Sequence, residues 1–383
     1  MQRREFLKLL GAGALVGAAP GAAWAQSAGA YRNLLLLIEL KGGNDGLNSV
    51  VPYGDPAYYN LRPRIAIKRD EAVQLDERTG LHPALAPLMA LWQARELAVI
   101  QGVGYPRPNL SHFRSIEIWD TASSSERYLH QGWLARAFAA HPVPGSFAAD
   151  GVIVGSQELG PLAGGARAIA LANTEQFLRQ ARLAAPAGGA GSGALAFLLK
   201  VEADIAQAAS GLKQNYAFRT GFPKGGFGDQ VHTAAQVIAN PSGVAVVRLT
   251  LSGFDTHQNQ PGQHANLLAQ LSAGLLALRS ALQELNRWDS TLIVTYAEFG
   301  RRAAENSSNG TDHGTANAHF VLGGRVKGGL YGQAPQLDRL DNGNLAYAVD
   351  FRSVYATVLE RWWALDPMPA LGAKFPVLDL IRA

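Results

Sequence analysis

Four short apolar runs recur along the chain, each too uniformly apolar for a strand with one face in water. They cover residues 33–40 (NLLLLIEL), 97–103 (LAVIQGV), 244–251 (VAVVRLTL) and 291–297 (TLIVTYA). Such runs are typical of strands buried on both faces by covering helices. Each leads into a polar or glycine-rich segment. We therefore expect four sheet strands whose carboxyl ends carry polar loops.

Helical periodicity accompanies these runs. Apolar residues return at helical spacing over 81–94, after Pro83, and over 264–288, between the last two predicted strands. Strands alternating with helices predict an α/β fold with a mostly parallel central sheet covered on both faces. In such sheets ligands bind beyond the carboxyl ends of the strands, which is where the polar segments lie.

The middle of the chain is less regular. Residues 183–196 are of low complexity, residues 221–230 contain another glycine-rich break, and the pattern between them predicts a helix at 195–212. We interpret the region around 183–230 as a flexible helical insertion lying over the main sheet of a single domain, 26–383. A separate small domain is the alternative.

The first 25 residues have the features of an export signal. Arg3 and Arg4 precede a moderate apolar stretch, and Ala23 and Ala25 suit A-x-A cleavage. The sequence after the two arginines, EFLK, resembles the twin-arginine signal of proteins exported in the folded state. An uncleaved anchor helix is the alternative. We expect a periplasmic or secreted protein, and no later segment predicts a stable membrane span.

Composition narrows the class further. The 383 residues are 48% hydrophobic and 17% charged, as in a soluble globular protein. The formal charge of +4 is too small and too scattered to indicate nucleic acid binding. The chain has no cysteine, so stability in an oxidising compartment must come from the core and from any bound metal. The oligomeric state is left open.

Two of the polar segments carry candidate metal ligands. Asp45 lies in GGNDGLN after the first run, where it is either a carboxylate ligand or part of an Asx turn. Asp255 and His257 lie in GFDTHQNQPGQH after the third run. Carboxylate and neutral imidazole both bind zinc, so this pair is a candidate ligand set. His264 is a weaker candidate, with helix capping or solvation as the alternatives.

Two later segments add to this set. Glu298 follows the fourth strand and is either a metal ligand or a solvated carboxylate paired with Arg301 or Arg302. Asp312 and His313 lie in a glycine-flanked loop before an apolar run, which allows the loop to return to the sheet end. His319 begins that run, and we interpret it as a buried, hydrogen-bonded histidine.

Ser111 stands at the predicted start of a helix in PRPNLSHFRSIEIWDTA. Ser111 or Asn109 could be an ordinary N-cap. A hydroxyl at this place can also act as a nucleophile near the free N–H groups of the helix, and Arg114 one turn on can hold a phosphate or sulfate. His112 could serve Ser111 as a base, but adjacent side chains on a helix point apart.

Taken together, the leader and the motifs ELKGGNDGLN, LHPAL, GYPRPNLSHFRSIEIWDT, FDTH and YAEFGRR…TDHGTANAHFVLGG resemble a bacterial family known as domain of unknown function 1501. That family is placed in the alkaline phosphatase and sulfatase superfamily. The resemblance implies a three-layer α/β/α sandwich with a bimetal site at the strand ends.

The resemblance also implies roles, position by position. Ser111 falls at the nucleophile, and the metal-binding positions fall at Asp45, Asp255, His257, Glu298 and His313. Phe299 stands where phosphatases have a further ligand histidine. Asp312 either fills that gap or a second metal is absent. Ser111 also lacks the C-x-P-S-R context of the sulfatase nucleophile.

The sequence thus predicts an exported hydrolase of small anionic esters, phosphate or sulfate, in which Ser111 attacks and Arg114 orients the anion. One or two divalent ions would assist, with zinc expected first and calcium, manganese or magnesium as alternatives. The competing hypothesis is a non-catalytic envelope protein that uses the same fold for binding or assembly.

Overall fold

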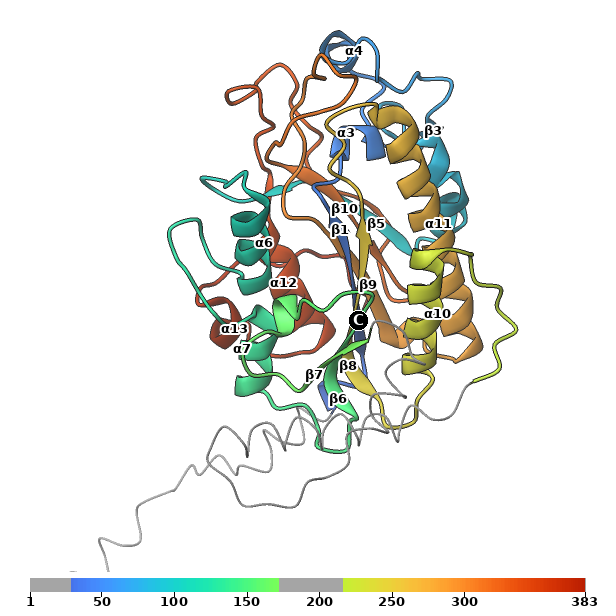
Figure 1. Ribbon diagram of the computed structural model, residues 1–383, viewed down its shortest axis with the longest axis vertical. Helices are drawn as coiled ribbons and strands as arrows, with labels where there is room; N and C mark the ends of the chain where they lie inside the picture. Colours follow the sequence, from blue (N-terminus) through green and yellow to red (C-terminus); the bar gives the residue numbers. More distant parts are fainter. Residues whose placement is uncertain (1–28, 172–215, 383) are drawn as a thin grey trace, which may run out of the picture.

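The computed structural model describes residues 29–171 and 216–382. The predicted leader and the helix expected at 195–212 lie outside these residues. The described part has three layers, with helices on both faces of a central sheet (Figure 1). This arrangement confirms the predicted three-layer α/β/α class.

A nine-stranded sheet forms the middle layer, in the order β11-β5-β10-β9-β1-β8-β6-β7 with β12 paired to β5. Neighbouring strands are parallel except β10, which runs antiparallel to both β5 and β9. The strands are β1 (Leu34–Lys41), β5 (Leu97–Gly104), β6 (Ala149–Val154), β7 (Ala168–Leu171), β8 (Val244–Ser252), β9 (Thr291–Tyr296), β10 (Asn317–Leu322), β11 (Gly329–Gly332) and β12 (Val349–Asp350). The four apolar runs are β1, β5, β8 and β9, so those predictions are confirmed.

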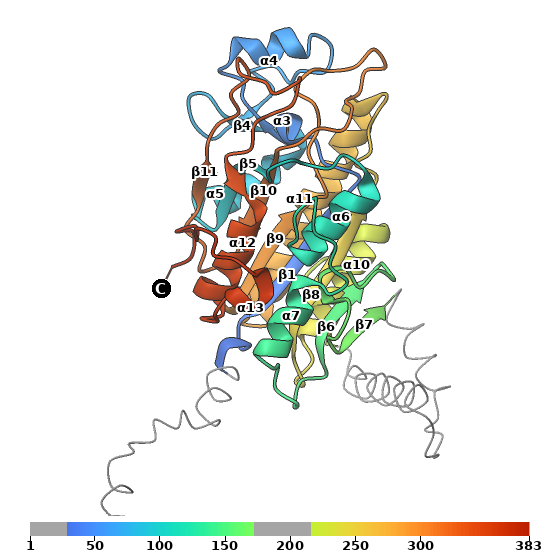
Figure 2. The same ribbon diagram turned by 90° about the vertical axis from the view of Figure 1, so that its left-hand side faces the viewer.

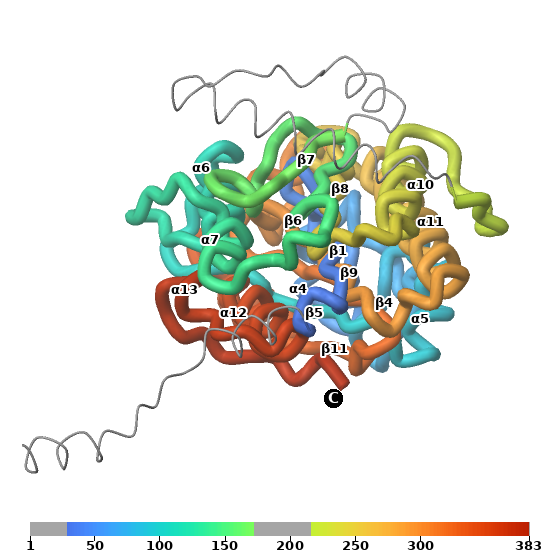
Figure 3. The backbone as a smooth tube through the Cα atoms, turned by 90° about the horizontal axis from the view of Figure 1, so that it is seen from below, coloured from blue at the N-terminus to red at the C-terminus, as the bar shows by residue number. Residues whose placement is uncertain are grey.

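Helices cover the two faces unequally. One face carries α6, α7, α12 and α13, and the other carries α10 and the long α11 (Figures 1 and 3). Their bounds are α6 (His112–Thr121), α7 (Trp133–Ala140), α10 (Gly226–Ile238), α11 (Gln260–Glu284), α12 (Phe351–Thr357) and α13 (Met368–Leu371). The last residues of the region interpreted as an insertion, 226–230, begin α10, which packs against α11.

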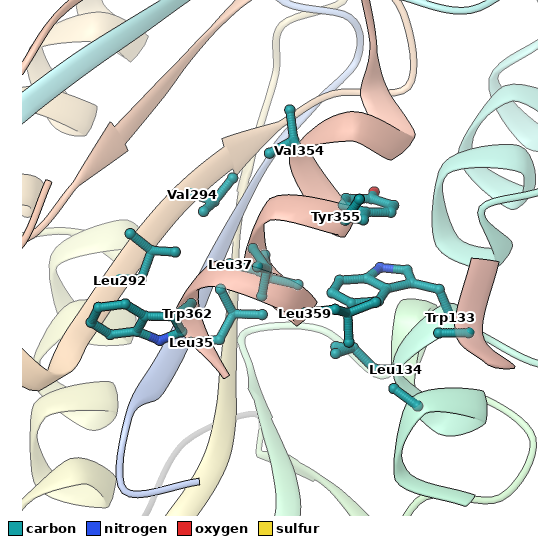
Figure 4. Close-up of a cluster of buried hydrophobic side chains, with 14 of the residues drawn as sticks. Leu35, Leu37, Trp133, Leu134, Leu292, Val294, Val354, Tyr355, Leu359 and Trp362 are labelled. Atoms are coloured by element: carbon teal, nitrogen blue, oxygen red, sulfur yellow. The ribbon is translucent and has the colours of Figure 1, made fainter. Parts of the chain in front are cut away.

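The residues of β1 alternate between two cores because successive side chains of a strand point to opposite faces. Leu35 and Leu37 join the core beneath α7 and α12. Figure 4 shows both leucines beside Trp133 and Tyr355, whose rings stack with centroids 4.4 Å apart. The alternate β1 residues join the core beneath α10 and α11; these are Leu34, Leu36, Ile38 and Leu40.

Two helical predictions need correction. The segment 81–94 divides into a 3-10 helix, Pro83–Leu88, and a short α5, Met89–Gln93, because Pro87 lacks the N–H that a continuous α-helix would use. Within the described residues, α11 is long and apolar enough to cross a membrane by length and composition, which the sequence reading excluded. Half of its most apolar window is buried inside the protein, as in a core helix.

A small cap lies beyond the carboxyl end of β1. It contains α3 (Gly46–Ser49), α4 (Pro56–Leu61) and a three-stranded sheet of β2 (Val50–Val51), β3 (Val73–Gln74) and β4 (Gly80–Leu81). Figure 2 shows this cap at the upper end of the molecule, above the sheet. The remaining short elements are 3-10 helices Gly160–Leu162 and Trp288–Ser290, and a π-helix Val358–Trp362.

Candidate metal site

Glycines allow the loops after β1, β8 and β9 to meet. Gly42 has a φ of +116°, and a Cβ there would overlap the backbone nitrogen of Asp255. A Cβ on Gly310 would likewise overlap the carbonyl group of His257. Only glycine permits backbones to approach this closely. The glycine-rich segments recognised in the sequence therefore bring distant loops together at the carboxyl ends of the strands.

Three imidazoles gather around the Asp255 carboxylate. The Nε2 atoms of His257 and His313 lie 3.0 and 3.2 Å from Oδ1, and Nε2 of His112 lies 3.4 Å from Oδ2. The Nε2 atoms of His257 and His313 are 3.0 Å apart. Two ligand atoms at about 2.0–2.1 Å from one tetrahedral zinc ion lie about 3.3 Å apart, so these separations fit a shared ion.

The other nitrogen of each ring faces an acceptor. Nδ1 of His313 lies 2.8 Å from the carbonyl oxygen of Leu110, and Nδ1 of His112 lies 2.9 Å from Oε1 of Glu298. Nδ1 of His257 lies 3.5 Å from Oδ1 of Asp312. An acceptor at Nδ1 favours the tautomer that leaves the Nε2 lone pair free, which is the usual arrangement around metal-binding histidines.

Burial, hydrogen bonds and nearby charges shift the pKa values of residues in the cluster. Partial burial acts to raise the pKa of Asp255, but the bonded Arg301 guanidinium, 2.6 Å away, holds that pKa below its usual value. The bond to Glu298 raises the pKa of His112, whereas burial lowers the pKa of His313. The bond from Asn306 lowers the pKa of Asp312. Asp255 and Asp312 therefore stay charged at neutral pH.

His112, Asp255 and His313 each offer a donor atom, and these three atoms lie within 4.8 Å of one another, a spacing that could hold one metal ion. The predicted residues His257, Glu298 and Asp312 surround this group through the contacts above. Glu298 contacts His112 and the backbone N–H of Gly42, where pairing with a neighbouring arginine was the alternative.

The structure places Asp45 in a different environment. It caps α3, accepting from the N–H groups of Leu47 and Asn48, and its other oxygen accepts from Arg62 at 2.6 Å and from Gln260. Burial opposes its charge, but Arg62 holds the pKa of Asp45 below the ordinary value. This geometry matches the Asx-turn alternative.

Ser111 occupies the N-cap position of α6, but its side chain makes no capping bond. It is exposed, and its two neighbours both touch the cluster, Leu110 through its carbonyl and His112 through its ring. Asn109 accepts a bond from the Ser111 N–H. Ser111 is therefore adjacent in the chain to two residues of the site.

Arg114 is not brought to the cluster. Its guanidinium donates to the carbonyl groups of Ser124, Ser125 and Arg127 and lies over the ring of Tyr128. The side chain thus holds the loop after α6 and is committed there.

Two other histidine predictions are corrected. His319 is buried as expected, but neither ring nitrogen has a hydrogen-bond partner among the described residues, and burial lowers its pKa to about 3. His264 is neither a cap nor solvated: it lies inside α11, buried, with Nε2 2.9 Å from Oδ1 of Asn44. Burial lowers its pKa to about 3 as well.

Sequence reasoning missed two members of the site. His112 was considered only as a base for Ser111, yet Nε2 of its ring lies 3.4 Å from Oδ2 of Asp255. Arg301 was considered only as a partner of Glu298, yet it binds Asp255 and the backbone carbonyl groups of Gly43 and Thr311. Arg301 and Arg302 follow strand β9 closely in the sequence, and this pair of arginines was the available signal.

Comparison with known families shows which family the chain belongs to. The family described as "Protein of unknown function (DUF1501)" matches residues 68–367, so the chain belongs to that family. The sequence-based resemblance to it is confirmed. No curated protein matches the sequence.

The chain is also distantly similar to several solved structures. They include the C-terminal periplasmic domain of EcEptC from Escherichia coli in complex with Zn (10% identity, TM-score 0.41, 76% of this chain and 72% of that chain covered). A phosphonate monoester hydrolase from Silicibacter pomeroyi has 11% identity and a TM-score of 0.40, with 90% and 75% covered. An alkaline phosphatase from the Antarctic bacterium TAB5 has 12% identity and a TM-score of 0.35, with 78% and 94% covered.

Proposed function

We propose that the protein is an exported, metal-dependent hydrolase of phosphate or sulfate esters. The observation that carries the proposal is the arrangement of three imidazoles whose Nε2 atoms face one carboxylate while each Nδ1 faces an acceptor. Asp255, His313, His112 and His257 would hold the ion. Glu298 and Asp312 would orient two of the rings.

The donor set favours zinc. Imidazole nitrogens suit zinc and other late transition metals, whereas calcium and magnesium prefer oxygen ligands. We propose one ion at this cluster, because Asp45 is committed to Arg62 and Phe299 packs against the rings of His112 and His313, 4.8 and 4.5 Å from their centroids.

Ser111 is the proposed nucleophile. Its hydroxyl has no hydrogen bond among the described residues and is exposed beside His112. The first N–H groups of α6 lack a side-chain cap, so they and the helix dipole can bind the anionic ester group, a role predicted for Arg114. A bound divalent cation would lower the pKa of the attacking oxygen and stabilise the negative charge that develops.

The test is elemental analysis followed by assay. We expect about one zinc ion per purified chain and turnover of p-nitrophenyl phosphate or p-nitrophenyl sulfate. Ser111→Ala should abolish turnover and keep the zinc, whereas Ser242→Ala, at the amino end of β8, should retain both. A chain that binds no metal, or full activity in Ser111→Ala, would refute the proposal.

One observation favours the non-catalytic alternative. Asp255 and Asp45 each pair with an arginine, Arg301 and Arg62, at 2.6 Å. In a protein that uses the fold only for binding, these pairs would neutralise the acids without metal. Zinc analysis separates the two functions, because the alternative expects none.

Export is part of the proposal and rests on the leader. Replacing Arg3 and Arg4 by lysine should retain the protein in the cytoplasm if the twin-arginine pathway carries it. Equal export of the double variant, measured by cell fractionation, would contradict that route.

A further inference from the structure

A cleft of about 790 Å³ opens beside the candidate metal site. His112, Asp255 and Glu298 line it and also belong to the histidine cluster, so a molecule in the cleft would reach that cluster. Sites for small molecules typically have volumes of about 300–1,000 Å³. The cleft therefore has room for the part of an ester that lies beyond its phosphate or sulfate group.

One wall of the cleft is a face of α6. The residues of this helix that line the cleft are His112, Phe113, Ile116, Glu117, Asp120 and Thr121. Residues three and four positions apart are neighbours on one side of a helix, which is the spacing within this set. The face that carries His112 to the metal site therefore continues along the cleft.

Apolar and small residues supply most of the surface that a ligand could touch. Phe113 is 89% exposed, and Ile116 and Leu129 are partly exposed. Covering such surface with an apolar group is favourable, and an aromatic ring can also stack on the ring of Phe113. The small residues of the lining, which leave space for a ligand, are Gly42, Gly132, Gly160, Ala163 and Gly253.

Most acids of the lining are already paired with a cation. Glu39, Glu117 and Asp255 bond to arginines at 2.6–2.8 Å. Glu158 bonds to Lys41 at 2.7 Å. Among the described residues that line the cleft, Lys41 is the single lysine or arginine, so this pair also occupies the cation of the lining.

The two other acids of the lining are not available to a charged ligand either. Glu298 is 2% exposed, and its Oε1 lies 2.9 Å from both the Gly42 backbone nitrogen and Nδ1 of His112. Burial raises the pKa of Asp120 to about 8, so its carboxyl group is uncharged at neutral pH. The described lining thus has no carboxylate, lysine or arginine that is free to pair with a charged group.

We propose that this cleft binds the alcohol part of the ester, and that this part is uncharged and apolar, with an aromatic ring as the best match. The inference rests on the proposed function, which places the phosphate or sulfate group at the histidine cluster. The alcohol part then lies against Phe113 and Ile116. A second charged group on it would lose its water without gaining a partner.

A pair of esters that differ by one ring tests the inference by turnover. The probes are 2-naphthyl phosphate and phenyl phosphate, with the two matching sulfates. Their leaving groups have similar acidity, so a difference in kcat/KM reports mainly the contact made by the added ring. We expect kcat/KM to be at least about fivefold higher for the naphthyl ester, through a lower KM. Equal values would overturn the inference.

Variants locate the site. Phe113→Ala should remove most of the preference for the naphthyl ester and keep the zinc, because this exposed side chain is not part of the core. Tyr347→Ala is the matched control: it truncates another exposed aromatic residue, outside the cleft lining, and should keep the preference. A preference that is unchanged in both Phe113→Ala and Ile116→Ala would overturn the inference.

Binding without turnover separates this inference from the proposed function. The probes are 2-naphthol and 6-hydroxy-2-naphthoate, which has the same ring system with a carboxylate, titrated into the purified protein by calorimetry. We expect 2-naphthol to bind at least about fivefold more tightly. Equal binding of the two, or no binding of 2-naphthol, would overturn the inference. So would a dimer that Phe113→Ala dissociates, because a second copy would then cover the cleft.

The two proposals can fail independently. Binding of 2-naphthol without hydrolysis of any ester would refute the hydrolase and leave the apolar site standing. Hydrolysis of phenyl phosphate with no preference for 2-naphthyl phosphate would refute the apolar site alone.

Discussion

Two acids follow neighbouring strands, yet they have opposite surroundings. Asp45 after β1 and Asp255 after β8 each accept from an arginine at 2.6 Å. Asp45 is 1% exposed, and four donors occupy its oxygens. The side chain of Asp255 is 45% exposed and faces three imidazole nitrogens. A fully bonded, buried acid fixes the fold, whereas a half-exposed acid with ring nitrogens around it is available for a ligand.

The largest expected difference between the two acids is in how much each contributes to folding stability. Removing one member of a buried ion pair leaves the other charge uncompensated, at a cost of about 3–5 kcal/mol. Asp45→Ala should therefore lower the free energy of unfolding by about that amount, measured by urea titration of the metal-free protein. Asp255→Ala is the matched change and should cost less, since its partner Arg301 keeps four backbone carbonyl acceptors. Equal losses in the two variants would contradict the comparison.

Zinc affinity should respond in the reverse order: a change near Asp255 should lower it, and a change near Asp45 should not. His313→Ala removes an imidazole from the Asp255 cluster, and we expect its zinc affinity to fall by more than about 100-fold, beyond the effect of removing an outer partner. His264→Gln changes a histidine near Asp45 and should leave zinc affinity unchanged. Competition with a chelator measures both. Equal zinc affinity in His313→Ala and the parent chain would exclude the cluster as the metal site.

A smaller loss of zinc affinity is expected when the changed residue contacts a ligand histidine and does not bind the ion itself. Asp312→Asn weakens the acceptor that faces Nδ1 of His257, and loss of such an outer partner typically costs about 10- to 100-fold in metal affinity. The exposed Asp338→Asn is the control. If Asp312→Asn matched the loss in His313→Ala, Asp312 would be a direct ligand, as the sequence suggested.

The strands and the meeting of their carboxyl ends could be predicted from sequence because buried parallel strands have a simple apolar pattern. Asp255 and His257 were identified by their position after such a strand, and His313 by its glycine-flanked loop before an apolar run. Whether an acid is bonded by arginine could not be predicted: Arg62, which neutralises Asp45, lies in the cap and carries no pattern that links it to the sheet. The periodicity of a helix also could not predict that the ring of His112 faces Asp255.

The smallest expected effect is on the pH dependence of the unfolding free energy. Burial lowers the pKa of His82 to about 4 and of His264 and His319 to about 3. An unfolded chain protonates histidine near pH 6.5, so between these values the unfolded state binds more protons. The stability of the neutral folded form is therefore fully present above about pH 6.5 and is lost as the pH falls, at up to about 1.4 kcal/mol per pH unit for each residue.

His319 offers the cleanest measurement of this effect because its ring has no hydrogen-bond partner to lose among the described residues. His319→Leu should make the decline of the unfolding free energy between pH 6 and 5 shallower by about 1 kcal/mol per pH unit. In the metal-free protein His112 should act in the opposite sense, since the bond to Glu298 raises its pKa and stabilises the fold as the pH falls. Parallel pH profiles for His319→Leu and the parent chain would mean that His319 takes up its proton in the folded state, and the contrast between buried and half-exposed histidines would then fail.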